Sequence, residues 1–243
     1  EMSRGLGDVY KRQIPGVGGL VWALHDKQPG EIWTVEEIEK VRARIEGAGF
    51  HMDVVESVNV HDDIKIGLPT RDQYIENYKT TLKNLAKFGV KVVTYNFMPI
   101  FDWTRTDLFH PLDDGSNALY YEKSKIQDAY KEMAEYILEN LHGKTFPGWE
   151  PERMAKLDEL FEAYRPVTKE KLWENLQYFL EAIMPTCHET GIKMAIHQDD
   201  PPWDIFGIPR LLCDKESIGR FLHMVDDEYN CLCLCCLLYT SPS

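Results

Sequence analysis

The sequence predicts an α/β fold in which helices cover a mostly parallel sheet. Short apolar segments with strand character alternate with longer segments whose apolar residues recur at helical spacing, and such alternation is typical of parallel sheets. The 243 residues are 44% hydrophobic and 12% aromatic, which is enough for one large core. Both a closed barrel and a doubly wound sheet satisfy this pattern.

The first strand and helix are predicted near the start of the chain. Residues 18–24 form a short apolar run, and residues 34–47 follow with helical periodicity. Thr34 and Glu37 have the spacing of a capping box at the start of that helix. Residues 51–58 then have the pattern of a second strand.

A second helix and a third strand come next. Residues 70–88 carry apolar side chains at helical spacing, and Gly89 is expected to end the helix. Thr70 with Gln73 predicts another capped start. Residues 90–97, rich in valine and aromatic residues, are expected to form the third strand.

The segment 102–166 interrupts the alternation. It contains a turn at 113–116, a predicted helix over about 124–141, and a Pro/Gly-containing stretch near Pro147. Loops of this length in compact domains usually have a function. The sequence leaves open whether this segment is a substrate-binding excursion or a structural decoration.

Regular alternation returns after the insertion. A long helix is predicted over 171–190, ending at Gly191, and a strand over 193–197. A further helix is expected at 216–225, and one more strand begins at 232–234.

Charge and cysteine content narrow the class of protein. The formal charge is −13, with 40 acidic and 27 basic side chains, which argues against a nucleic-acid groove or a membrane-binding face. No apolar run approaches the roughly 20 residues that span a bilayer. Six cysteines without regular pairing favour a reducing cytoplasm over a disulfide framework.

The most informative stretch is the end of the strand at 193–197. It stops at His197, followed by Asp199, Asp200 and two prolines. Parallel α/β enzymes present their chemistry at the carboxyl ends of strands. The stretch therefore predicts a site with metal-capable side chains, although a polar turn after a buried strand is an alternative.

Three cysteines support the prediction of a metal site. Cys231, Cys233 and Cys235 alternate along a strand pattern, so all three are expected on one face. The structural alternative is that they are small buried strand residues.

Both ends of the chain look foreign to the domain. Residues 3–13 resemble a translated sequencing-library adapter, and residues 236–243 resemble the same adapter read on the opposite strand. We therefore expect residues 1–13 and 236–243 to be artefacts and the genuine domain to cover about 14–235.

Motifs spread along the chain together resemble the mannonate dehydratase family. They are Ile14-Pro-Gly-Val17, Ala23-Leu-His-Asp26, Gly30-Glu-Ile-Trp33, Val54-Val-Glu-Ser57, Gly67-Leu-Pro-Thr-Arg71, Tyr95-Asn-Phe-Met-Pro99, Phe101-Asp-Trp-Thr-Arg-Thr-Asp107 and Ile196-His-Gln-Asp-Asp-Pro-Pro202. The resemblance implies an α/β (β/α)8 TIM barrel of the xylose-isomerase-like type. It also implies that about five of the eight strands are present, with a helical insertion at about 102–166.

The resemblance further implies a chemistry. The family uses Mn²⁺ or Fe²⁺ to dehydrate D-mannonate to 2-dehydro-3-deoxy-D-gluconate in hexuronate catabolism. Its metal ligands fall on His197 and Cys235, and the other ligands belong to strands beyond residue 235. The chain departs from the family where Gln198 replaces a common proline and where Cys231 and Cys233 replace glycine and threonine. We expect the 243-residue chain alone to be inactive.

Candidate substrate-binding residues follow from the chemistry of a sugar acid. The planar guanidinium of Arg105 matches a carboxylate, and Asn96 and Asp102 near the same strand end suit hydroxyl groups. Surface ion pairs and loop capping are the alternatives for these residues.

Three further residues are candidates at the same strand ends. Asp199 and Asp200 are expected to orient His197 or bind hydroxyls, or else to form a turn before Pro201. His25 follows the first strand and either faces the cavity or is structural.

Two other classes of function remain open from the sequence. One is a xylose-isomerase-like sugar isomerase or epimerase, which would supply more carboxylate ligands and no cysteine. The other is a non-catalytic protein that binds a sugar acid. A small-molecule substrate and a cytoplasmic location are expected, and assembly into a homo-oligomer is allowed.

Overall fold

The structure is a computed structural model that describes residues 15–125, 130–140 and 155–234. The adapter-like segments, residues 1–13 and 236–243, lie outside the described residues, as do Pro147 and Cys235. Within the described ranges, none of the helices has both the length and the apolar character needed to cross a membrane.

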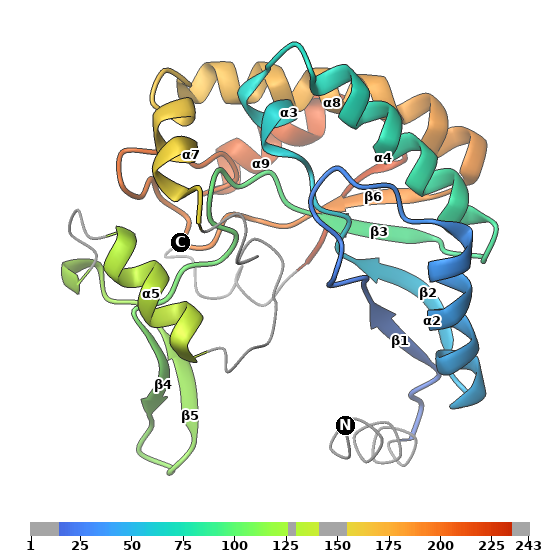
Figure 1. Ribbon diagram of the computed structural model, residues 1–243, viewed down its shortest axis with the longest axis horizontal. Coiled ribbons are helices and arrows are strands. Elements are labelled where there is room, and N and C mark those ends of the chain that lie inside the picture. Colours follow the sequence, from blue (N-terminus) through green and yellow to red (C-terminus); the bar gives the residue numbers. More distant parts are fainter. Residues whose placement is uncertain (1–14, 126–129, 141–154, 235–243) are drawn as a thin grey trace.

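Five parallel strands form the central sheet (Figure 1). In spatial order they are β1 (Gly19–Trp22), β2 (His51–Glu56), β3 (Val92–Tyr95), β6 (Lys193–Ile196) and β7 (Asn230–Leu232). Each strand pairs in parallel with the next strand of this sheet along the chain. A doubly wound sheet would reverse this order at a switch point. The predicted α/β class with a parallel sheet is therefore confirmed, and the strand order is the sequential one.

Helices lie along one side of the curved sheet (Figure 1). The main ones are α2 (Val35–Gly47), α4 (Arg71–Ala86), α8 (Lys169–Thr190) and α9 (Lys215–Met224). The capping box predicted for α2 is present, since Thr34 accepts the backbone N–H of Glu37 and Glu37 accepts that of Thr34. Gly191, with φ 70°, ends α8 in the left-handed conformation that glycine tolerates best.

The predicted cap of α4 was wrong. The side chain of Thr70 makes no capping hydrogen bond to the helix. Its hydroxyl instead donates to the carboxylate of Asp63, on the short helix α3 (Asp62–Ile66), which the sequence did not predict. The Thr70 hydroxyl therefore bonds to Asp63 and not to the backbone at the start of α4.

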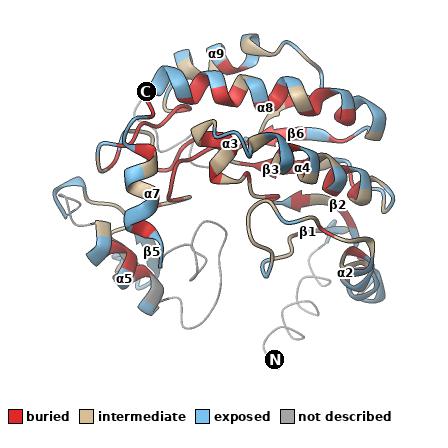
Figure 2. Ribbon diagram, turned by 45° about the horizontal axis from the view of Figure 1, so that its top comes forward, coloured by how far each residue is buried: buried red, intermediate tan, exposed pale blue. Residues whose placement is uncertain are grey.

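The core lies between the sheet and these helices. Val55, Val93 and Ile196 of the strands are fully buried, and Phe179 of α8 contacts the ring of Tyr95 of β3 in the same core. Figure 2 shows buried and exposed residues alternating along α8, as expected for a helix with one face on a sheet. The burial of these apolar side chains is the main stabilising term of the fold.

The insertion after β3 contains more structure than predicted. A hairpin of β4 (Asp107–Pro111) and β5 (Asn117–Tyr120) encloses the predicted turn, in which Gly115 has φ 83°. Residues 123–125 form a 3-10 turn, and α5 (Tyr130–Asn140) is the described part of the predicted helix. A further helix, α7 (Leu157–Tyr164), was not predicted.

The last strand begins two residues earlier than predicted. Asn230 pairs with Met194, and its side chain donates to the carbonyl of Val225, so β7 covers Asn230–Leu232. Cys231 therefore lies in the strand while Cys233 follows it. The N–H of Cys233 still donates to the carbonyl of Ile196, and the single face predicted for the cysteines stays a prediction.

Candidate active site

The carboxyl ends of four neighbouring strands bring the candidate residues to one edge of the sheet. Glu56, the last residue of β2, pairs with Thr94 of β3, and Tyr95 of β3 pairs with Ile196 of β6. Ile196 in turn pairs with the last residue of β7, Leu232. Because the strands are parallel and in register, Glu56, Asn96, His197 and Cys233 follow one another along this edge.

His197 is held at this edge by its backbone and faces Glu56. Its N–H donates to the carbonyl of Tyr95 at 2.8 Å, which extends the ladder one step beyond β6. Its Nε2 lies 2.8 Å from Oε1 of Glu56, and the imidazole is 17% exposed. This contact is not aligned as a hydrogen bond, and the described residues give the buried Nε2 no other partner. Glu56 lies within the Val54–Ser57 motif, and no role was predicted for it from the sequence.

Glu56 and His197 each stabilise the charged form of the other. Contact with His197 lowers the pKa of Glu56 against burial, which raises it. Burial would lower the pKa of His197, but the Cys233 thiol and the Glu56 carboxylate outweigh it and raise the pKa. The edge thus carries an imidazole beside an ionised carboxylate.

The donors at this edge fit part of a metal shell. An imidazole nitrogen and a carboxylate oxygen both suit a divalent cation such as Mn²⁺ or Fe²⁺. The described part of the chain holds no group of three or more His, Cys, Asp or Glu side chains that could bind an ion. The second predicted ligand, Cys235, lies outside the described residues.

The side chain of Gln198 forms a hydrogen bond with the segment that follows β7. It is buried, and its Nε2 donates to the carbonyl of Cys233 at 2.8 Å. The backbone N–H of Cys233 donates to Ile196 at 2.9 Å. The glutamine that replaces the common proline therefore adds a side-chain hydrogen bond between the two strand ends.

A pocket next to this edge contains two of the predicted substrate residues. Asn96 and Asp102 line it together with Asn59 and Lys65 and four mainly apolar neighbours, Pro29, Val60, Met98 and Ile100. Asn96 accepts the backbone N–H of Met98 at 3.1 Å, which fixes its amide. Lys65 is buried and donates to the carbonyl of Met98 at 2.9 Å. Sequence reasoning missed Lys65 because the helix that carries it was not predicted.

Arg105 and Asp200 form a nearly buried ion pair. Nη1 and Nη2 of Arg105 each donate to one carboxylate oxygen of Asp200, both at 2.7 Å. The side chains are 12% and 10% exposed. The guanidinium face predicted to bind a substrate carboxylate is thus filled by a carboxylate of the chain itself. The substrate contacts of Arg105 and Asp200 remain predictions.

Asp199 anchors a loop. It is buried, and its Oδ2 accepts the backbone N–H groups of Leu211 at 2.5 Å and Leu212 at 2.8 Å. Burial raises the pKa of this carboxyl, and nearby Arg210 opposes the rise. These contacts match the turn-forming alternative, and the predicted role of Asp199 beside His197 remains untested.

Arg210 is a second buried cation that sequence reasoning did not single out. Its side chain is fully buried and donates to the carbonyls of Phe101 at 3.0 Å and Asp102 at 3.4 Å. Arg210 therefore positions the backbone of the segment that carries Asp102 to the pocket.

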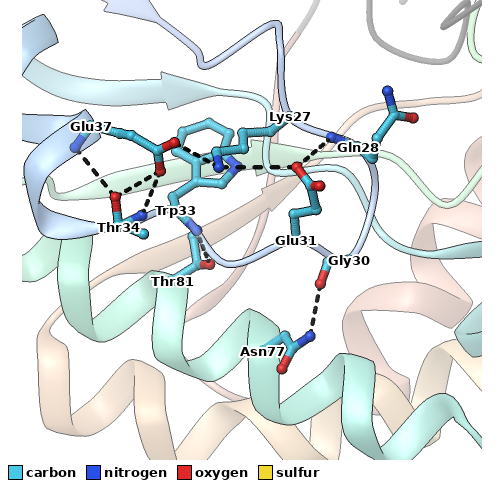
Figure 3. Close-up of polar contacts among 9 residues, drawn as sticks. All are labelled: Lys27, Gln28, Gly30, Glu31, Trp33, Thr34, Glu37, Asn77 and Thr81. Carbon is cyan, nitrogen blue, oxygen red and sulfur yellow. Dashed lines mark hydrogen bonds and ion pairs between the residues drawn. The ribbon is translucent and has the colours of Figure 1, made fainter.

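His25 lies apart from these residues. It is exposed in the turn after β1 and lines a different pocket with Trp33, Ser57 and Asn59, among others. The loop around it is held by polar contacts shown in Figure 3, including the 2.7 Å ion pair between Lys27 and Glu37. Because Asn59 lines both pockets, His25 borders the same edge of the sheet without entering the pocket of Asn96.

Comparison with known proteins assigns this chain to a family. The family model described as D-mannonate dehydratase (UxuA) matches residues 4–242. The chain is 58% identical to a mannonate dehydratase of Endomicrobium trichonymphae, covering 93% of this chain and 62% of that protein. It is 53% identical to a mannonate dehydratase of Bacillus subtilis (strain 168), covering 93% of this chain and 63% of that protein.

A solved structure agrees with these relatives. The crystal structure of mannonate dehydratase from Streptococcus suis serotype 2 superposes with a TM-score of 0.77 at 44% identity, covering 91% of this chain and 58% of that chain. The present chain thus spans about three fifths of the length of the proteins it matches. With a family model matching nearly every residue and relatives of more than 50% identity, the chain belongs to the D-mannonate dehydratase (UxuA) family.

Proposed function

We propose that this protein catalyses the metal-dependent dehydration of D-mannonate to 2-dehydro-3-deoxy-D-gluconate in hexuronate catabolism. The observation that carries the proposal is family membership over nearly the whole chain, together with a polar edge built around His197. Because the chain spans only 62% of its first relative, the activity is proposed for the full-length protein.

We also propose that the sheet is part of a (β/α)8 barrel. Its five parallel strands are in sequential order, and the sheet is curved with helices along one side (Figure 1). Barrels place their active sites at the carboxyl ends of the strands. That is the edge where Asn96 and His197 lie.

His197 and Cys235 are the proposed ligands of a bound Mn²⁺ or Fe²⁺. When bound, the cation would supply positive charge that favours loss of the hydrogen on the carbon next to the substrate carboxylate. Oε1 of Glu56 lies 2.8 Å from Nε2 of His197. We expect this carboxylate to fix the orientation of His197, as outer carboxylates do in other metal sites.

The pocket residues would hold the sugar acid. Asn96, whose amide is fixed by Met98, and Asp102, whose backbone is held by Arg210, are proposed to bind hydroxyl groups. The ion pair of Arg105 and Asp200 joins the loop after β3 to the loop after β6. If Arg105 contacts the substrate directly, its guanidinium must bind the substrate and Asp200 at the same time.

The reaction is tested by incubating the full-length protein with D-mannonate. We expect a 2-oxo acid to form with added Mn²⁺ or Fe²⁺ and turnover to stop after chelation. Interconversion of sugars without loss of water would instead support an isomerase or epimerase. Binding of D-mannonate without turnover under any metal would support a sugar-acid binding protein.

The metal role of His197 has its own test. His197→Ala should lower the amount of Mn²⁺ retained after gel filtration and abolish turnover. His188→Ala is the matched control, because His188 is half exposed and pairs with Asp227 at the surface. Equal metal content in the two variants would exclude His197 as a ligand.

A further inference from the structure

Gln198 makes a contact between two strand ends to which the proposed mechanism gives no role. Its side chain is buried, and its Nε2 donates to the carbonyl of Cys233 at 2.8 Å. Proline, which is common at this position in the family, has no side-chain donor. The contact therefore depends on a residue by which this chain departs from the family.

The hydrogen bond continues the ladder between β6 and β7. Ile196 pairs with Leu232, and the N–H of Cys233 donates to the carbonyl of Ile196 at 2.9 Å. In a parallel ladder with this register, the next acceptor on the side of β7 is the carbonyl of Cys233. The amide of Gln198 satisfies that acceptor beyond the last residue of both strands.

The contact joins the two segments that carry the proposed metal ligands. Gln198 directly follows His197, and Cys235 comes two residues after Cys233. β7 has only three residues and is the last strand of the described sheet, so its ladder within that sheet is formed with β6 alone. The bond from Gln198 therefore restricts the path of the chain just before Cys235.

This amide should contribute more to position than to stability. Its other polar atom, Oε1, is buried and has no hydrogen-bond partner among the described residues. An unpaired buried acceptor offsets much of what one hydrogen bond gains. An apolar side chain of similar length at position 198 is therefore expected to leave the fold about as stable as before.

We propose that Gln198 is a positioning residue that fixes the spacing between His197 and Cys235 and so sets how tightly the protein binds its metal. Ligands that are already held in place lose less conformational entropy when the ion binds. The inference rests on the proposed function for the identity of the two ligands.

The test titrates metal-free full-length protein with Co²⁺. This ion takes the same nitrogen and sulfur ligands as Fe²⁺, and its thiolate complexes have a charge-transfer absorption that reports a bound cysteine. Gln198→Met keeps the length of the side chain and removes the donor. We expect the Kd for Co²⁺ to rise about 10-fold and the absorption per bound ion to fall, with an unchanged urea midpoint.

Control variants identify the thiol and the effect of the substitution itself. Gln177→Met is the matched control, because the amide of Gln177 donates to Glu181 in an exposed contact on α8, and it should change neither quantity. Cys235→Ser should abolish the absorption, and Cys233→Ser should retain it. Should Gln198→Met fail to fold, Gln198→Leu provides the same comparison with a shorter apolar side chain.

The outcomes separate this inference from the proposed function. Equal Kd and equal absorption in Gln198→Met and the wild type would overturn the role of Gln198 and leave the dehydration standing. A higher Kd with unchanged absorption per bound ion would also overturn it, because the position of the thiol would then be unaffected.

Two further outcomes concern the ligands and the reaction. A wild-type absorption that does not depend on Cys235 would overturn that ligand and, with it, this inference. The expected effect of Gln198→Met in a protein that does not dehydrate D-mannonate would support the positioning role and overturn the proposed function.

Discussion

The loop after β1 and the loop after β3 are both held by polar contacts to distant residues, such as that of Asn77 with Gly30 across 47 residues, but the loop after β1 also has a set of contacts between near neighbours. In the first loop, Lys27 and Thr34 both contact Glu37, within ten residues (Figure 3). In the second, Arg105 contacts Asp200 and Arg210 contacts Phe101, across 95 and 109 residues. The first set stabilises a helix start locally, whereas the second set can form only after distant strands have paired.

Breaking the distant ion pair should have the largest effect on stability. Asp200→Ala leaves the guanidinium of Arg105 buried without its carboxylate, and we expect the free energy of unfolding to fall by about 3–5 kcal/mol. Urea denaturation measures the change. Glu174→Ala, which removes an exposed partner of Lys171, should cost less than about 0.5 kcal/mol.

A double variant sharpens this result. If the cost comes from the lone buried charge, Arg105→Met combined with Asp200→Met should recover most of the loss. A double variant as unstable as Asp200→Ala would show that packing, and not the uncompensated charge, sets the cost.

A second distant contact should have an intermediate effect. Tyr164→Phe removes the hydroxyl that donates to the buried carboxylate of Asp62, 102 residues away. We expect a loss of about 1–3 kcal/mol, because the carboxylate loses a charged hydrogen bond. Tyr178→Phe is the control, since its hydroxyl donates to the exposed Asp72. Equal urea midpoints for the two variants would contradict the expectation.

The local helix cap should matter less. Thr34→Ala removes the acceptor for the N–H of Glu37 and should cost about 1 kcal/mol. Thr70→Ala, at the start of α4, removes no helix cap and should cost less. A larger drop in melting temperature for Thr70→Ala than for Thr34→Ala would contradict this expectation.

The smallest expected effect is a dependence of stability on pH. Hydrogen bonding to Lys27 lowers the pKa of Glu37 from 4.5 to about 2. Because the folded-state pKa lies below the unfolded value, this contribution is present above pH 4.5 and is lost as the pH falls toward 2. Glu37 is partly exposed, so the effect should stay below about 1 kcal/mol. Glu37→Gln should flatten the stability profile in this range, and an unchanged slope would contradict the assignment.

Local signals in the sequence were enough to predict much of the fold. The capping box at Thr34, the terminating glycine after α8 and the apolar strands all depend on neighbours a few residues away. The sequential order of the strands was not determined, because alternation alone fits both a barrel and a doubly wound sheet. The missed helix α3 has only five residues, too few for a periodic pattern.

The candidate site was predicted in part. The structure brings Asn96 and Asp102 into one pocket and places His197 beside it at the same sheet edge. The pairing of Arg105 with Asp200 could not be foreseen, because nothing in the sequence marks two residues 95 apart as partners. Lys65 was missed because it lies on α3, the short helix that was not predicted.

The order of the strands has a consequence for recombination between relatives. Because β1, β2, β3, β6 and β7 stand side by side in chain order, any single crossover point between two of them divides the sheet at one strand pair only. The hairpin of β4 and β5 pairs with itself, so a crossover placed outside residues 107–120 leaves it undivided. Within the described sheet, hybrids that exchange whole strand and helix units between family members therefore have one new seam to accommodate, and closure into the proposed barrel would add a second between its first and last strands.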